Sequence, residues 1–237
     1  MEFTNARWLS VLDVWHAGQV GLPAVIRWSK YLESDGGARR QDGLQHSFSI
    51  TLLARVLIEK LRPHVALDGE LLMTSVLVHD YGEGEVGHDT LFIDKSADGD
   101  LREYTAFVAR FMQLSNELFE PFCRAFLLQF ALRNPENFPP AARAIMVELV
   151  REKHMEALAF EALECWDYML YAFEQYRTRG NAKILVQTLR NLIPRLRELV
   201  GLLPGFGAEV FTEELYDWCL RFMRIYDGQW IEQKGER

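Results

Sequence analysis

The chain has few cysteines, no long apolar run and no excess of positive charge, and each shortage argues against a class of protein. Its three cysteines, Cys123, Cys165 and Cys219, stand singly and are odd in number, so neither a disulfide framework nor a cysteine-based zinc site is predicted. No stretch approaches the roughly 20 apolar residues that cross a bilayer, and residues 1–15 lack the pattern of a signal peptide. We therefore expect a cytoplasmic protein with buried free thiols and no membrane partner.

Acidic residues outnumber basic ones, with 34 Asp and Glu against 26 Lys and Arg and a formal net charge of -8. Such a surface repels a polyanion, so nucleic acid is not expected as a partner, whereas a small phosphate ester can still enter a locally basic pocket. A hydrophobic fraction of 49% is ordinary for a globular protein. At 237 residues the chain can bury a sizeable core, and we predict one domain over residues 1–237.

Apolar residues recur with helical periodicity along most of the chain, and no stretch alternates convincingly as a strand does. Residues 83–100 are rich in Gly and Asp and are predicted to form an ordered loop. Gly180 predicts a helix end, and Pro194 a kink. The fold class is therefore all-α, with predicted helices over residues 4–15, 22–32, 42–61, 67–81, 101–131, 141–179, 182–202 and 212–226.

Two of these helices carry candidate metal ligands. His46 shares the apolar face of residues 42–61 with Ile50 and Leu57, so its side chain is expected to point inward. His79 and Asp80 stand near the end of the next helix, followed by Tyr81 and Gly82, where the helix loosens. Imidazole nitrogens and carboxylate oxygens together can hold a divalent ion that keeps positions open for water and substrate. A lone buried His is more often a core residue, so the metal site rests on the three residues together.

The order of these residues resembles the HD-domain metal-dependent phosphohydrolases, whose motif is His, then His-Asp, then Asp. Within them the chain is most similar to the bacterial 5′-deoxynucleotidase group, because the segment from His79 to Glu83 fits the His-Asp-x-x-Glu of that group. Gly87 with Asp89 resembles the Gly-Asp that follows, although His88 intervenes. The resemblance covers about residues 25–174 and implies an HD-type helical bundle, on which the unmatched helices 182–226 would pack.

Two further segments carry the resemblance. Arg27-Trp28 resembles an Arg-Trp pair that helps hold the substrate, and residues 164–172 resemble the Asp-x-Leu-x-x-x-Leu-x-Ala helix. The second match places Glu164 where the family has its last Asp ligand, with Asp167, one helical turn on, as the runner-up. The resemblance thus implies four ligands for an ion of Mn, Co, Mg, Zn or Fe: His46, His79, Asp80 and Glu164.

The resemblance implies hydrolysis of a nucleoside 5′-monophosphate, which includes the deoxynucleotides, by metal-activated water. Asp80 and Glu83 would be catalytic, with Glu83 accepting a proton from the water. Arg27, Trp28 and Lys95 would bind the substrate, although such a tryptophan is more often plain core.

Other interpretations stay open. One is a dNTP or alarmone hydrolase, and another is a nucleotide-binding scaffold with little turnover, which the Glu in place of Asp motivates. A homodimer through the apolar C-terminal helices, with Trp218, Phe222 and Trp230, is compatible with each, and core packing explains these residues equally well.

Overall fold

The chain folds as an all-α bundle in the computed structural model, which describes residues 6–29, 38–87, 96–133 and 136–235, with side chains described from residue 8 to residue 226. The helices are α1 (Ala6–Ala24), α3 (Gly43–Leu61), α4 (Gly69–Val78), α5 (Tyr81–Val86), α6 (Ala97–Phe111), α7 (Asn116–Leu128), α8 (Pro140–Glu152), α9 (His154–Arg179), α10 (Ala182–Leu202), α11 (Phe206–Glu209) and α12 (Glu213–Gly235). The prediction of an all-α fold is confirmed. No helix in the described ranges combines the length and apolar content needed to cross a membrane.

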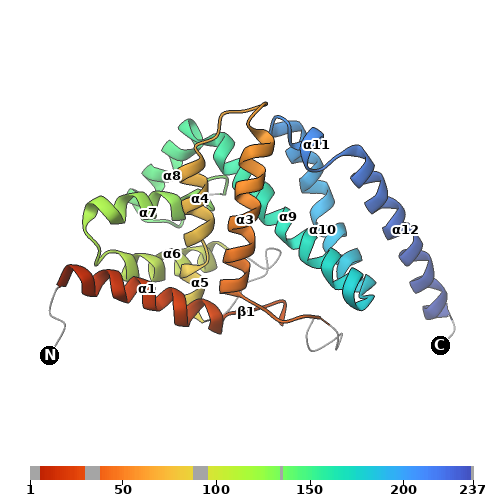
Figure 1. Ribbon diagram of the computed structural model, residues 1–237, viewed down its shortest axis with the longest axis horizontal. Helices are drawn as coiled ribbons and strands as arrows, with labels where there is room; N and C mark the ends of the chain where they lie inside the picture. Colours follow the sequence, from red (N-terminus) through yellow and green to blue (C-terminus); the bar gives the residue numbers. More distant parts are fainter. Residues whose placement is uncertain (1–5, 30–37, 88–95, 134–135, 236–237) are drawn as a thin grey trace.

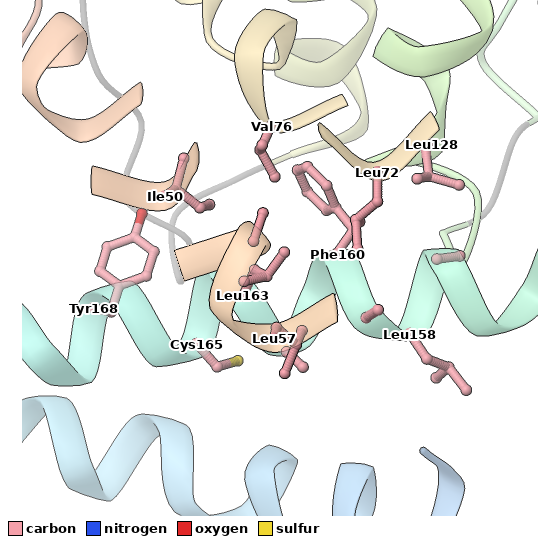
Figure 2. Packing of buried hydrophobic residues seen from close by; sticks show 14 of the residues in the cluster. Ile50, Leu57, Leu72, Val76, Leu128, Leu158, Phe160, Leu163, Cys165 and Tyr168 are labelled. Atoms are coloured by element: carbon pink, nitrogen blue, oxygen red, sulfur yellow. The ribbon is translucent and has the colours of Figure 1, made fainter. Parts of the chain in front are cut away.

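Helix α9 is the element on which the bundle is built (Figure 1). It contacts α3 and α4 on one side and α10 on another, while α12 packs on α10 and α1 packs on α5 and α3. Its side chains follow this division: Phe160 extends toward Leu72 and Val76 of α4, whereas Cys165 points toward α10 (Figure 2). A helix buried on both sides needs apolar residues around most of its circumference, which explains the length of the buried stretch.

Local signals place the helix ends that matter for the site. Asp42 caps α3 by accepting a hydrogen bond from the Gln45 amide at 2.8 Å, and the Gln45 side chain accepts one from the Asp42 amide. Gly180 ends α9 in the left-handed conformation with φ 68°, as the sequence predicted. The cap puts His46 in the first turn of α3, and hence near one end of the bundle.

The N-terminal prediction was right in part. Residues 6–24 form one helix, which contains the described part of the predicted helix 4–15. The predicted second helix over residues 22–32 was wrong at its centre, where strand β1 (Ile26–Arg27) pairs with β2 (Gln41–Asp42) in antiparallel register, and residues 30–32 lie outside the described residues. Arg27 lies opposite Gln41, so the strand pairing ties the Arg27 backbone directly to the residues that start α3. Two residues are too short for strand periodicity to appear in the sequence.

Three more boundaries differ from the prediction. The single helix over residues 101–131 is two helices, α6 and α7, separated at residues 112–115. The helix over residues 141–179 breaks at Lys153, whose φ and ψ of −130° and 32° are not helical. The predicted loop over residues 83–100 contains the end of α5 and the start of α6, and residues 88–95 lie outside the described residues. Helix α10 continues through Pro194.

The C-terminal aromatic residues pack within the chain. Trp218 stacks on Phe222 with centroids 5.0 Å apart, and it also contacts Phe173 of α9 at 5.2 Å. Trp218 is 36% exposed and Phe222 is buried, while the side chain of Trp230 lies outside the described residues. These contacts agree with the core-packing interpretation, and the homodimer stays a prediction.

Candidate metal centre

The candidate centre lies where α3, the end of α4 and the middle of α9 meet. His79 is the last residue of the α4 hydrogen-bond pattern, and Asp80 follows with φ −88° and ψ −1° before α5 begins. Neighbouring residues within a helix do not face each other. The turn between the two helices brings this pair together, so that His79 Nε2 lies 3.1 Å from Asp80 Oδ1.

Close packing of α5 fixes this turn in place. A Cβ atom on Gly82 would lie 2.5 Å from the carbonyl oxygen of Glu103, so α5 rests directly on the backbone of α6. Any larger residue would push the two helices apart. The glycine after the His-Asp pair therefore serves helix packing and keeps Asp80 against the site.

Three side chains from different elements converge on one point. His46 Nε2 and His79 Nε2 are 3.1 Å apart, and Glu164 Oε1 lies 3.6 Å from the first and 3.3 Å from the second. One ligand atom from each of the three residues lies within 4.8 Å of the others. An ion bound at about 2.0–2.2 Å by each atom would hold them roughly 3–4 Å apart, so the donor set fits a single divalent ion.

Asp80 stands at the same centre. Its Oδ2 lies 3.7 Å from His46 Nε2 and accepts a hydrogen bond from Arg27 Nη1 at 3.0 Å. The structure thus brings together all of His46, His79, Asp80 and Glu164, and three of them are almost fully buried, with Glu164 at 14% side-chain exposure. Asp80 could supply a fourth oxygen while Arg27 balances its charge.

Hydrogen bonds at the far side of each ring set the tautomers. His79 Nδ1 lies 2.8 Å from the carbonyl oxygen of Val76, which can only accept, so Nδ1 carries the proton. His46 Nδ1 lies 2.8 Å from Asp167 Oδ2, and Asp167 Oδ1 accepts from Ser49 Oγ at 2.7 Å. In the neutral rings both Nε2 lone pairs then face the centre, as metal-binding histidines require.

This arrangement answers the choice between Glu164 and Asp167 in geometric terms. Asp167 approaches His46 on the Nδ1 side, where it orients the ring, whereas Glu164 reaches the Nε2 side. Glu164 Oε1 is buried and makes no hydrogen bond among the described residues. A buried carboxylate oxygen that faces two imidazole lone pairs is costly without a cation between them.

The charges around the site also favour a cation between the two rings and Glu164. Burial and the Arg27 charge would lower the pKa of His46, but the carboxylates of Asp167 and Asp80 raise it to about 10. Burial would raise the pKa of Glu164, but the nearby His46 and His79 rings hold it well below its usual value. The field therefore favours positive charge at the Nε2 side, which a proton or a metal ion can supply.

Arg27 and Glu83 lie next to Asp80. Arg27 is 3% exposed, and besides Asp80 it donates from Nη2 to the Tyr168 hydroxyl at 2.9 Å. Glu83 is buried in α5, with Oε2 3.8 Å from Arg27 Nη1. The predicted phosphate-binding and proton-accepting residues are thus beside the centre. Lys95, the remaining predicted binding residue, lies outside the described residues.

Trp28 is packed as a core residue. It stacks on Tyr171 with centroids 4.3 Å apart at an interplanar angle of 13°, and its Nε1 donates to Gln41 Oε1 at 3.1 Å. Its φ of 63° lies in the left-handed region, which is strained for a tryptophan. The stacking on Tyr171 and the hydrogen bond to Gln41 hold Trp28 in this conformation.

A cavity that sequence reasoning missed reaches the centre at Glu164. It has a volume of about 310 Å³ and lies between the end of α7, α9 and α10. Gln129, at its wall, also donates from Nε2 to the His79 carbonyl oxygen at 3.0 Å. No motif marks it, because its walls come from three separate parts of the chain: Gln129, Arg133, Phe160, Glu161, Glu164 and Arg195.

Comparisons with known proteins give no family for this chain. No protein-family model matches it. Searches of curated proteins and of solved structures also find no match. What the structure establishes is an all-α bundle with a buried group of His46, His79 and Glu164 that could bind a metal ion.

Proposed function

We propose that the protein is a metal-dependent phosphohydrolase that releases phosphate from a nucleoside 5′-monophosphate. The observation that carries the proposal is the convergence of His46 Nε2, His79 Nε2 and Glu164 Oε1 at one buried point. The resemblance of His46, His79-Asp80 and Glu83 to the HD-domain motif supplies the reaction class.

The residues around the centre have roles that suit this reaction. A divalent ion held there would polarise a phosphoryl oxygen and lower the pKa of bound water. Glu83 would accept a proton from that water, and Arg27 would offset negative charge on the phosphate through its planar guanidinium. In the reaction an oxygen of water bonds to phosphorus, the P–O bond to the nucleoside breaks, and the leaving oxygen ends with a proton.

A second function is favoured by one observation. Arg27 is almost fully buried and already donates to Asp80 and Tyr168, as a structural arginine does. A nucleotide-binding scaffold with little turnover would use the same fold and the same ion. The two functions differ in whether phosphate is released.

The test is phosphate release from a panel of ribo- and deoxyribonucleoside 5′-monophosphates, with Mn²⁺, Co²⁺, Mg²⁺, Zn²⁺ or Fe²⁺ added to metal-free protein. We expect release by the intact chain and loss of at least about 100-fold in Asp80→Asn, which keeps the side-chain shape but removes the charge. His64→Asn, at a half-exposed histidine near α11, is the matched control and should keep full activity. Metal binding without phosphate release from any substrate would favour the scaffold.

A further inference from the structure

Helix α3 presents an apolar stripe on the side that faces away from the metal centre. His46 is fully buried, and Phe48, two residues on and therefore about 200° around the helix, is 74% exposed. No other large hydrophobic side chain among the described residues is as exposed. Exposed apolar residues repeat every four positions along this side of α3: Leu44, Phe48, Leu52 and Val56. The outer side of the helix thus has the composition of a packed surface.

Helix α1 carries a second apolar stripe, which consists of Trp8, Val11, Leu12 and Trp15. Trp8 is 62% exposed and Trp15 is 58% exposed, and seven residues separate each from the next position on the same side, which is Leu22 after Trp15. A Cβ atom on Gly43, the first residue of α3, would lie 2.9 Å from the Leu22 carbonyl oxygen. The two tryptophans are therefore on the side of α1 that meets the start of α3 (Figure 1). We call the two stripes together the α1–α3 surface.

The composition of α1 favours a protein partner over a membrane. Ala17 and Leu22 are buried in the bundle, and the exposed stripe occupies another side, so the helix is apolar on both. A helix that is hydrophobic all round is normally buried on all sides. Helix α1 lacks the length and apolar content to cross a membrane, and it has one Arg and no Lys for the cationic face of a helix that lies on one.

The exposed apolar area is that of a homodimer interface. At roughly 150–250 Å² for a whole aromatic side chain, Trp8, Trp15 and Phe48 leave about 300–480 Å² accessible. The five aliphatic side chains of the two stripes add roughly 100–250 Å². A stable interface buries about 800 Å² on each partner, of which about 65% is apolar in homodimers, or about 520 Å². The α1–α3 surface supplies this area without a contribution from α12.

The charges of the surface suit contact with a second copy. In a two-fold interface the same patch is used twice, so unbalanced charge of one sign would meet itself and repel. Neither stripe contains a charged residue, and Arg55, beside Val56, pairs with Glu59 at 2.8 Å. Two chains that each carry a formal net charge of -8 meet with least repulsion at such a surface.

We propose that the α1–α3 surface is the interface of a homodimer, in which α1 and α3 pack on the same helices of a second copy. The inference goes beyond the proposed function and does not depend on it. Trp218 and Phe222 of α12 already stack on each other within one chain. The cavity at Glu164 is formed by α7, α9 and α10, so its walls take no part in the interface.

The test is the oligomeric state, measured by sedimentation equilibrium over a range of micromolar concentrations. We expect a dimer of the intact chain. Phe48→Glu should raise the Kd of the dimer at least about 100-fold, because it brings a carboxylate into an apolar contact in both copies. Trp15→Glu tests the same interface from α1 and should act in the same direction. Val147→Glu, at an exposed position of α8, is the matched control and should keep the dimer. Far-ultraviolet circular dichroism checks that each variant folds.

Cross-linking locates the contact directly. The three natural cysteines, Cys123, Cys165 and Cys219, are buried, so an added surface thiol is the main target of a short bismaleimide. Phe48→Cys should give a covalent dimer in high yield, whereas Val147→Cys should give little. Equal yields from the two variants would overturn the inference.

The other occupants of the surface give different results. A monomeric intact chain overturns the inference, as does a dimer whose Kd neither Phe48→Glu nor Trp15→Glu changes. A dimer that only Ile225→Glu dissociates, from the exposed side of α12, would place the contact at the C-terminal helices. A monomer that floats with vesicles of phosphatidylcholine and phosphatidylserine, and no longer floats as Phe48→Glu, would make the surface a membrane contact.

Discussion

Two buried regions of the same bundle are stabilised in opposite ways. In the aromatic cluster of α6 and α7, the Phe107 ring stacks between the ring of Phe111, with centroids 4.2 Å apart, and the ring of Phe126, with centroids 4.0 Å apart, so apolar faces meet one another. At the candidate metal centre, His46 and His79 are almost fully buried and the Glu164 side chain is 14% exposed, and their ring nitrogens and carboxylate oxygen face one another. The first region contributes stability by itself, whereas the second is stabilised when a proton or a metal ion lies between the facing groups.

Removing the centre of the aromatic cluster should have the largest effect on the free energy of unfolding. Phe107→Ala should lower the free energy of unfolding by about 3–5 kcal/mol, because it leaves a cavity between two stacked rings. Denaturant unfolding followed by circular dichroism measures the loss. Met112→Ala, at a position 64% exposed just after α6, should cost little. Similar losses in both variants would contradict the packing described.

The centre should respond to metal where the aromatic cluster does not. An ion at 100 times its Kd stabilises the folded state by about 2.7 kcal/mol, so Mn²⁺ or Zn²⁺ should raise Tm and a chelator should reverse the rise. His79→Ala should lose this increment, because it removes an Nε2 ligand. Phe107→Ala should keep the increment despite its lower starting Tm. An unchanged increment in His79→Ala would place the ion elsewhere.

Asp167 should raise the affinity for the metal ion without being a ligand itself. Its contact with His46 Nδ1 orients the ring, so Asp167→Asn should lower metal affinity by about 10–100-fold without abolishing binding. Titration calorimetry with the metal-free protein measures the change. Glu174→Gln, on the same helix and with its carboxylate accepting a hydrogen bond from Gln175 Nε2, is the control. Complete loss of binding in Asp167→Asn would make Asp167 a ligand.

The smallest effect should come from a charge pair that is already balanced. Lys153 Nζ donates to Asp68 Oδ2 at 2.6 Å and lowers the pKa of Asp68, which is about a third exposed. Because the folded-state pKa lies below the unfolded value, the pair stabilises the fold above about pH 4 and loses that contribution as the pH falls further. Lys153→Met should cost about 0.5 kcal/mol at pH 7 and almost nothing near pH 2. A difference that grows on acidification would have the wrong sign.

Much of the fold could be predicted because periodicity and helix ends are local properties. The predicted bounds of residues 182–202 coincide with α10, and Gly180 ends α9 as expected. The breaks at residues 112–115 and at Lys153 were missed. The first has a local signal in Ser115, the N-cap residue of α7, whereas the second is accompanied by a distant contact. Lys153 lies at its break with its amine on Asp68, the N-cap of α4, which is distant in sequence.

For the site, the sequence by itself determined that His46 and the His79-Asp80 pair face the interior, since the apolar residues that share their helix faces must be buried. It could not decide between Glu164 and Asp167, which lie only about 60° apart around one helix. The tertiary structure decided this through the packing of α9 against α3, which turns Glu164 to Nε2 and Asp167 to Nδ1 of His46. The tautomer of His46 and the cavity also depend on contacts between distant segments, which local sequence patterns do not reveal.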